Sequence, residues 1–112
     1  MNIRQNRAKD IITRKAAEFI SREASSQSLI TVTDCFLSDD SKQATLLISV
    51  LPTEEERPAK SFVEHHLNEL RAHIRENTRL KNIPYFAVEI DIGEKHRRKI
   101  EEIIAEDKKA EK

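Results

Sequence analysis

The sequence predicts an α+β fold, with a three-stranded sheet and helices packed on one of its faces. Two observations support this prediction. Apolar residues recur every three or four positions in residues 3–23 and again from about residue 56 into the high 70s, which is typical of amphipathic helices. Three other segments are short, apolar and rich in β-branched residues, or alternate between apolar and polar, which is typical of strands. The resulting order, helix-strand-strand-helix-strand-helix, favours an α+β sandwich.

The first half of the chain predicts a helix followed by a hairpin. Residues 3–23 place Ile12 and Phe19 on one helical stripe, and the small polar residues that follow end this helix. Residues 29–37 (LITVTDCFL) and 43–51 (QATLLISVL) are the predicted strands. Between them lies SDDSK, whose Asp and Ser side chains can bind nearby backbone amides. So short a connection favours antiparallel pairing of the two strands.

The second half predicts a long helix, a third strand and a short final helix. The long helix begins in the acidic segment PTEEERPAK and ends before Pro84, because proline biases the residue before it away from helical geometry. Residues 85–92 alternate as in a half-buried strand. If this strand pairs parallel with the first one, the crossover between them should be right-handed. Residues 94–107 supply the last helix, so we expect one domain over residues 1–107 and a charged, disordered tail at 108–112.

Composition and charge exclude several function classes. The 112 residues include 20 basic and 20 acidic side chains, so a nucleic-acid contact would have to depend on where the charges lie. With one glycine and no nucleophile set, the chain predicts no enzyme, no cofactor and no small-molecule substrate. Cys35 is the only cysteine and lies in a predicted strand, where we expect a buried, inert thiol. Neither a leader nor a long apolar run is present, which predicts a cytoplasmic protein without a membrane contact.

Basic residues recur on one flank of the predicted long helix. Arg71, Arg75 and Arg79 are four residues apart, so on a continuous helix they would lie in one row beside the apolar stripe. Lys81 extends this row beyond the helix. Such a row can bind the backbone phosphates of a nucleic acid, and it is also compatible with an ordinary solvated helix flank.

Two weaker patterns lie elsewhere in the chain. Arg4 and Arg7 on the first helix are a second candidate anchor for phosphates, although an amphipathic helix needs a polar face in any case. His65, Glu69 and His73 follow one another at intervals of four residues and could point toward a metal ion. Their spacing is not that of the metalloprotease motif, so we interpret them as polar surface residues and expect no metal site.

The segments that carry these features also match the pattern of one protein family. The most specific matches are the Leu70-Arg71 pair, the Arg79-Leu80 pair, Pro84, Asp91, and Ala44 after the turn aspartates Asp39 and Asp40. On these residues the chain resembles ribosome-binding factor A, over roughly Arg4 to Asp107. The resemblance implies a type II KH-like domain in which a kink interrupts the long helix.

The kink segment is where the chain departs from the family. Family members carry an Ala-x-Gly signature at the kink, and the corresponding residues here are His66, Leu67 and Asn68. Asparagine is the next best residue after glycine for a positive φ, so we expect Asn68 to provide the interruption. These substitutions indicate a divergent member of the family.

The resemblance further implies a function. Members of the family bind the free small ribosomal subunit and its 16S ribosomal RNA, support late processing of that RNA, and are linked to growth in the cold. They are not enzymes. The present chain would then be a monomeric RNA-binding protein in which the arginine row supplies phosphate contacts. Three alternatives remain open. A KH-like module for another RNA also predicts salt-sensitive RNA binding, whereas a protein–protein adaptor predicts none. A metal-dependent enzyme around His65, Glu69 and His73 would require stoichiometric metal in the purified protein.

Overall fold

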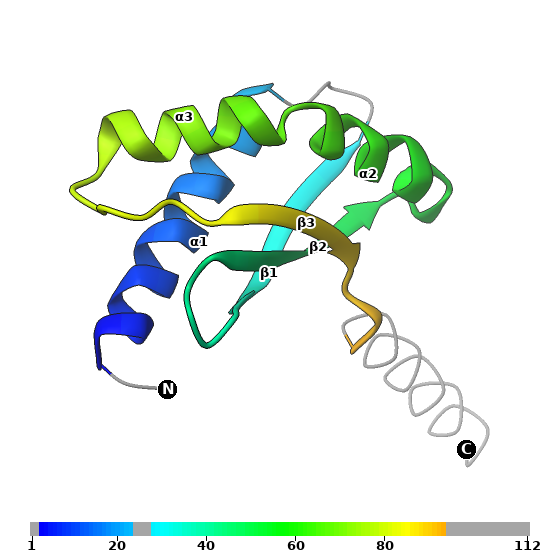
Figure 1. Ribbon diagram of the computed structural model, residues 1–112. Coiled ribbons are helices and arrows are strands. Elements are labelled where there is room, and N and C mark those ends of the chain that lie inside the picture. The colour runs from blue at the N-terminus through cyan, green and yellow to red at the C-terminus, as the bar shows by residue number, and fades with distance from the viewer. Residues whose placement is uncertain (1–2, 24–27, 94–112) are drawn as a thin grey trace, which may run out of the picture.

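Three strands and three α-helices make up the part of the computed structural model that is described, residues 3–23 and 28–93 (Figure 1). In chain order, the elements are α1 (Ile3–Glu23), β1 (Leu29–Leu37), β2 (Gln43–Leu51), the 3-10 helix η1 (Thr53–Glu55), α2 (Glu56–His65), α3 (Leu67–Asn77) and β3 (Tyr85–Ile90). This order confirms the predicted α+β arrangement as far as β3. The final helix predicted at 94–107 and the tail predicted at 108–112 lie outside the described residues.

The sheet has the order β1-β2-β3, with β2 in the middle. β1 and β2 pair antiparallel, from Leu29 opposite Leu51 to Leu37 opposite Ala44, which confirms the predicted hairpin. β3 pairs parallel with β2. The parallel pairing of the third strand with the first, considered above from the sequence, does not form, because β3 and β1 are not neighbours in the sheet. Parallel neighbours need a long connection, and η1, α2 and α3 supply it.

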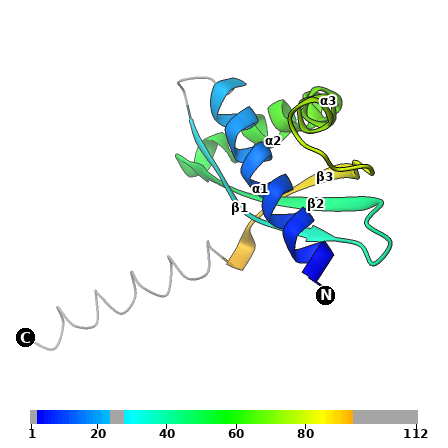
Figure 2. The same cartoon turned by 90° about the vertical axis from the view of Figure 1, so that its left-hand side faces the viewer.

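The helices cover one face of the sheet, and the side chains between these two layers form the core (Figure 1 and Figure 2). α1 packs against β1 and α3, whereas α2 packs against β3 and β2. The buried strand residues are Cys35, Ala44, Leu46, Ile48, Val50 and Val88. Because side chains alternate along a strand, their neighbours point to the opposite face, which includes the exposed aromatic residues Phe36 and Tyr85.

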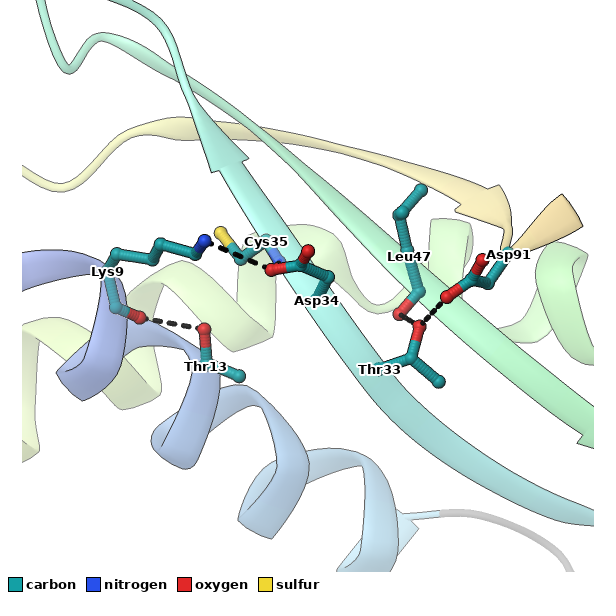
Figure 3. Close-up of polar contacts among 7 residues, drawn as sticks. All are labelled: Lys9, Thr13, Thr33, Asp34, Cys35, Leu47 and Asp91. Carbon is teal, nitrogen blue, oxygen red and sulfur yellow. Dashed lines mark hydrogen bonds and ion pairs between the residues drawn. The ribbon is translucent and has the colours of Figure 1, made fainter. Parts of the chain in front are cut away.

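β1 contains a bulge that the sequence did not predict. Its pairing shifts just after Val32, and Thr33 has no partner on β2. One extra residue reverses the alternation of side chains, so Val32 before the bulge and Cys35 after it both face the core. The Thr33 hydroxyl donates to the Asp91 carboxylate at 2.6 Å and lies 3.2 Å from the Leu47 carbonyl oxygen (Figure 3). The bulge therefore ties the end of β3 to the hairpin.

The long helix is interrupted at His66, the first residue of the predicted kink segment. His66 has φ −109° and ψ 11°, and its N–H donates to the Val63 carbonyl oxygen at 3.0 Å in a tightened turn. Its Nδ1 lies 2.8 Å from the Phe62 carbonyl oxygen, and the two rings pack 4.3 Å apart. Leu67 already begins α3, and Asn68 lies inside α3 without a positive φ. The expected left-handed asparagine is therefore wrong, because the break falls at His66, which keeps a negative φ.

Side chains of the SDDSK segment build the β1–β2 turn, as predicted. The Ser38 hydroxyl donates to Asp40 Oδ1 at 2.7 Å, and the same oxygen accepts the Lys42 backbone N–H at 3.0 Å. Ser41 adopts the left-handed conformation with φ 59°, and its N–H donates to the Ser38 carbonyl oxygen at 2.9 Å. The Tyr85 N–H donates to the Lys42 carbonyl oxygen at 2.9 Å. The turn is therefore fixed beside the first residue of β3.

Candidate nucleic-acid interface

A hollow of about 520 Å³ lies between the β1–β2 turn, α3 and the segment that leads into β3. Its wall includes the basic residues Lys42, Arg71, Arg75 and Lys81, together with Asp40 and Tyr85. Four cations face one carboxylate, so this region is positive although the chain as a whole is neutral. We call it the basic hollow.

Arg71 holds the segment between α3 and β3 in place. Its Nε donates to the Pro84 carbonyl oxygen at 3.0 Å, and its Nη2 donates to the Ile83 carbonyl oxygen at 3.1 Å. Its guanidinium carbon lies 4.0 Å from the centre of the Tyr85 ring. These contacts fix the guanidinium plane, which then lies over one face of the tyrosine. Arg71 keeps its charge in the wall of the hollow while its donors bind the backbone.

The other three cations of the hollow have exposed side chains. Lys42 lies at the end of the β1–β2 turn, Arg75 in the last turns of α3, and Lys81 in the following segment. Within residues 3–23 and 28–93, none of the three forms an ion pair. An anion that enters the hollow can therefore bind Arg75 and Lys81 without first displacing a carboxylate of the described chain, whereas the charge of Lys42 also acts on the neighbouring Asp40 carboxylate.

Asp40 is the single acid of the wall, and the turn already uses its carboxylate. The Ser38 hydroxyl, and after it the Lys42 backbone N–H, hold the pKa of the Asp40 carboxyl below its ordinary value. The group is therefore ionised at neutral pH. Its charge stabilises the turn and reduces, without cancelling, the positive charge of the hollow.

The predicted arginine row is only partly realised. Arg71 and Arg75 are one turn apart on α3 and both line the hollow. α3 ends at Asn77, and Thr78 is extended with φ −138° and ψ 170°, so Arg79 leaves the helical row. The Thr78 hydroxyl donates to the Ile74 carbonyl oxygen at 2.7 Å, which caps the last turn of the helix. Arg79 is exposed but is not part of the wall.

The second predicted anchor lies on α1. The side chain of Arg7 is exposed, whereas the side chain of Arg4 lies outside the described part of the structure. Figure 1 shows the first turns of α1 on the same side of the molecule as the β1–β2 turn and the end of α3. The two anchors therefore remain compatible with one extended contact surface.

The candidate metal ligands His65, Glu69 and His73 do not form a metal site. The helix break separates His65 on α2 from Glu69 and His73 on α3. His65 Nδ1 lies 2.7 Å from the Ser61 carbonyl oxygen, and the His73 ring packs 5.6 Å from that of Phe19. Among the described residues, no group of three or more His, Cys, Asp or Glu side chains could hold a metal ion.

Cys35 is buried, as the sequence predicts. Burial raises the pKa of its thiol from 9.0 to about 11, and the positive charge of Lys9 only partly opposes this effect. The thiol therefore stays protonated at neutral pH and has no access to reagents. Neither catalysis nor metal binding fits such a group.

The sequence did not identify Lys42 and Tyr85 as site residues. Each looked ordinary in its own segment, one in a polar turn and the other at the start of a strand. They meet because Gln43 pairs with Tyr85 at the start of the parallel ladder between β2 and β3. Only the pairing of these two strands could have revealed this neighbourhood.

No helix in the described ranges, 3–23 and 28–93, combines the length and the apolar character that crossing a membrane requires. This finding agrees with the absence of a long apolar run in the sequence.

Sequence comparison connects the chain to one family. The sequence model of the ribosome-binding factor A family matches residues 4–104. A curated relative, ribosome-binding factor A of Thermodesulfovibrio yellowstonii, is 32% identical over 108 residues, which cover 95% of this chain and 92% of the relative. The match thus includes α1, the sheet, both central helices and the whole basic hollow.

Structural comparison agrees with the sequence comparison. The crystal structure of ribosome-binding factor A from Thermus thermophilus superposes with a TM-score of 0.69 over 76% of this chain and 92% of that chain, at 20% identity. The solution structure of a Thermotoga maritima protein, a candidate ribosome binding factor A, superposes with a TM-score of 0.64 over 75% of this chain and 83% of that chain, at 21% identity. At these identities the likeness concerns the fold, and it confirms the KH-like architecture that the resemblance implies.

Proposed function

The chain belongs to the ribosome-binding factor A family, and we propose that it is an assembly factor of the small ribosomal subunit. It binds the free small subunit and its 16S ribosomal RNA, and it supports late processing of that RNA. It acts by binding rather than by catalysis, as a cytoplasmic monomer that needs no cofactor or small-molecule substrate. The same activity sustains growth in the cold.

The basic hollow is the observation that carries this proposal. In a chain of zero net charge, four cations gather around one opening, and three of them have exposed side chains without an ion pair in the described structure. Such an arrangement suits RNA phosphates, because each lysine or arginine contact releases condensed counterions from the RNA. Arg75 and Lys81 supply the direct contacts, and Arg71 adds its charge from a fixed position.

The contact surface extends beyond the hollow. Arg79 continues it along the segment before β3, and Arg7 and Arg4 on α1 form the second anchor. Phosphates in folded ribosomal RNA are spaced along a backbone, so several separated cations can each bind one phosphate.

Co-sedimentation across a salt series tests the proposal. The protein is centrifuged with free small subunits, with large subunits and with intact ribosomes. We expect binding to free small subunits that weakens steeply with salt. The variant Arg75→Ala/Lys81→Ala should bind more weakly, and the slope of log affinity against log salt should decrease by about 1.5, because two phosphate contacts are lost.

A matched control removes the same charge elsewhere. Arg57 and Lys60 lie on α2, around a separate hollow that also contains Glu54, Glu56 and Glu64. The variant Arg57→Ala/Lys60→Ala should keep both the affinity and the salt slope. Equal binding to all three ribosomal particles, or equal losses in the two variants, would contradict the proposed function.

A further inference from the structure

Tyr85 is an exposed aromatic residue in a fixed position. Its relative exposure is 67%, although the guanidinium carbon of Arg71 lies 4.0 Å from the centre of one ring face. The Arg71 guanidinium is itself held by the carbonyl oxygens of Pro84 and Ile83. Since one face of the ring is covered and most of the side chain is still exposed, the other face is open to solvent.

Tyr85 also lines a second hollow. This hollow has a volume of about 270 Å³ and is formed by β2 and β3, with Thr45 and Ala87 in its wall. Tyr85 and Gln43 line both this hollow and the basic hollow. The small side chains of Thr45 and Ala87 leave space for a flat group beside the tyrosine. A site for a planar ring therefore adjoins a site for an anion.

We infer that Tyr85 stacks on one unpaired RNA base, while a phosphate of the same nucleotide or its neighbour binds in the basic hollow. An aromatic side chain next to several cations is the combination with which proteins bind single-stranded nucleic acids. A base within a duplex has both faces covered by its neighbours, so only an unpaired base can reach the ring. Because the Arg71 guanidinium already orders the ring, stacking requires little further loss of side-chain freedom.

Charge distinguishes this ligand from an apolar protein segment. The four cations of the basic hollow would lose water against an apolar partner without gaining a countercharge. A nucleotide supplies both a ring for Tyr85 and an anion for Lys42, Arg75 and Lys81. The inference rests on the proposed function, since it assumes that the ligand is RNA, and it adds that the contacted RNA is locally unpaired.

The test uses the full chain and the fact that Tyr85 is its only tyrosine. The ring protons of Tyr85 are followed by NMR during titration with a short single-stranded RNA of mixed sequence. The titration is repeated with the same strand annealed to its complement. We expect the ring resonances to move upfield with the single strand, because a stacked base shields them, and to stay nearly unchanged with the duplex.

Binding to a fluorescently labelled strand then compares three variants. Tyr85→Ala should weaken binding roughly tenfold to a hundredfold, because one base loses its stacking partner. Tyr85→Phe should retain the affinity, since it keeps the ring. Phe36→Ala is the matched control, because Phe36 is an exposed aromatic of the same sheet with Lys9 Nζ 5.7 Å from its ring centre, and it lines neither hollow. It should bind as the unaltered protein does.

The outcomes separate this inference from the proposed function. Unshifted Tyr85 resonances at saturating RNA, or a Tyr85→Ala variant with unchanged affinity, would overturn the stacking site, and small-subunit binding by the basic hollow would still stand. A shifted ring without preference for the small subunit would support the stacking site and remove the proposed function. The titration of the unaltered protein decides the matter even if Tyr85→Ala does not fold.

Discussion

Two polar regions border the same hairpin, and they use their charges in opposite ways. At the bulge of β1, Lys9 Nζ lies 3.1 Å from Asp34 Oδ1, and the same oxygen accepts the Cys35 backbone N–H at 2.8 Å. Figure 3 shows this group beside the contact between Thr33 and Asp91. At the basic hollow, by contrast, three of four cations extend into solvent without an ion pair in the described structure.

The charges of the two regions therefore differ in whether a ligand can bind them. The side chains at the bulge already bind other groups of the chain, so their loss should lower stability and leave RNA binding intact. The free cations of the hollow contribute little to the fold, so their loss should lower binding and leave stability intact. Arg71 belongs to both categories, because it binds backbone oxygens and also contributes charge to the hollow.

The largest effect on stability is expected for Arg71→Ala. This change leaves two carbonyl oxygens without the guanidinium donors and removes the contact with Tyr85, so the free energy of unfolding should fall by about 2–3 kcal/mol. Denaturant unfolding of the variant and the unaltered protein measures the difference. Arg71→Lys keeps the charge but cannot reproduce the two parallel donors, and it should recover less than half of the loss.

The RNA binding of Arg71→Lys separates the two roles of Arg71. Because Arg71→Lys keeps the charge but loses the guanidinium that orders Tyr85, it should keep the salt dependence of RNA binding even though its stability is reduced. A lysine variant as stable as the unaltered protein would show that the two backbone hydrogen bonds contribute nothing measurable, and the division into structural and available charges would lose its clearest case.

A smaller effect is expected for Thr33→Val. The substitution keeps the shape of the side chain and removes the hydroxyl that donates to Asp91 at 2.6 Å, so the free energy of unfolding should fall by about 1–2 kcal/mol. Thr33→Ser retains the hydroxyl and should lose less. Small-subunit binding by both variants should equal that of the unaltered protein, and a specific loss of binding in Thr33→Val would contradict the assignment of the bulge to stability.

The sequence predicted well what depends on local chemistry. Alternation, helical periodicity and the SDDSK segment predicted the elements, the hairpin and the bonded turn, and all three are confirmed by the structure. The position of the helix break also falls within the segment that the family resemblance indicates. The exact residue was missed, because no residue type in the segment favours a break at His66 over one at Asn68.

Features that depend on pairing between distant segments could not be predicted. Thr33 and Asp91 are 58 positions apart, and nothing in either segment indicates their contact. Arg71 looked like its neighbour Arg75 in the helical pattern, yet only Arg71 is close enough to the segment before β3 to bind its carbonyl oxygens. For the same reason, the sequence could not predict that Lys42 lies beside Tyr85, because this contact follows from the register of β2 and β3.

A last effect is expected on how the free energy of unfolding changes with pH through Cys35, which lies next to the ion pair of the bulge. This change should be absent near neutral pH and appear only above pH 9. Its pKa is about 11 in the folded protein against 9.0 for a free thiol, because burial disfavours the thiolate. The folded state thus holds this proton more tightly than the unfolded chain does. The corresponding stabilisation is fully present below pH 9 and is lost as the pH rises to about 11. Below pH 9, the native thiol should also resist alkylation until the protein unfolds.

Comparison with Cys35→Ala isolates this contribution from other groups that titrate at high pH. The free energy of unfolding of the unaltered protein should decrease more steeply between pH 9 and 11 than that of the variant. Parallel curves for Cys35→Ala and the unaltered protein would show that the thiol ionises equally in both states. The core at the bulge would then admit water, and the contrast with the solvent-filled basic hollow would weaken.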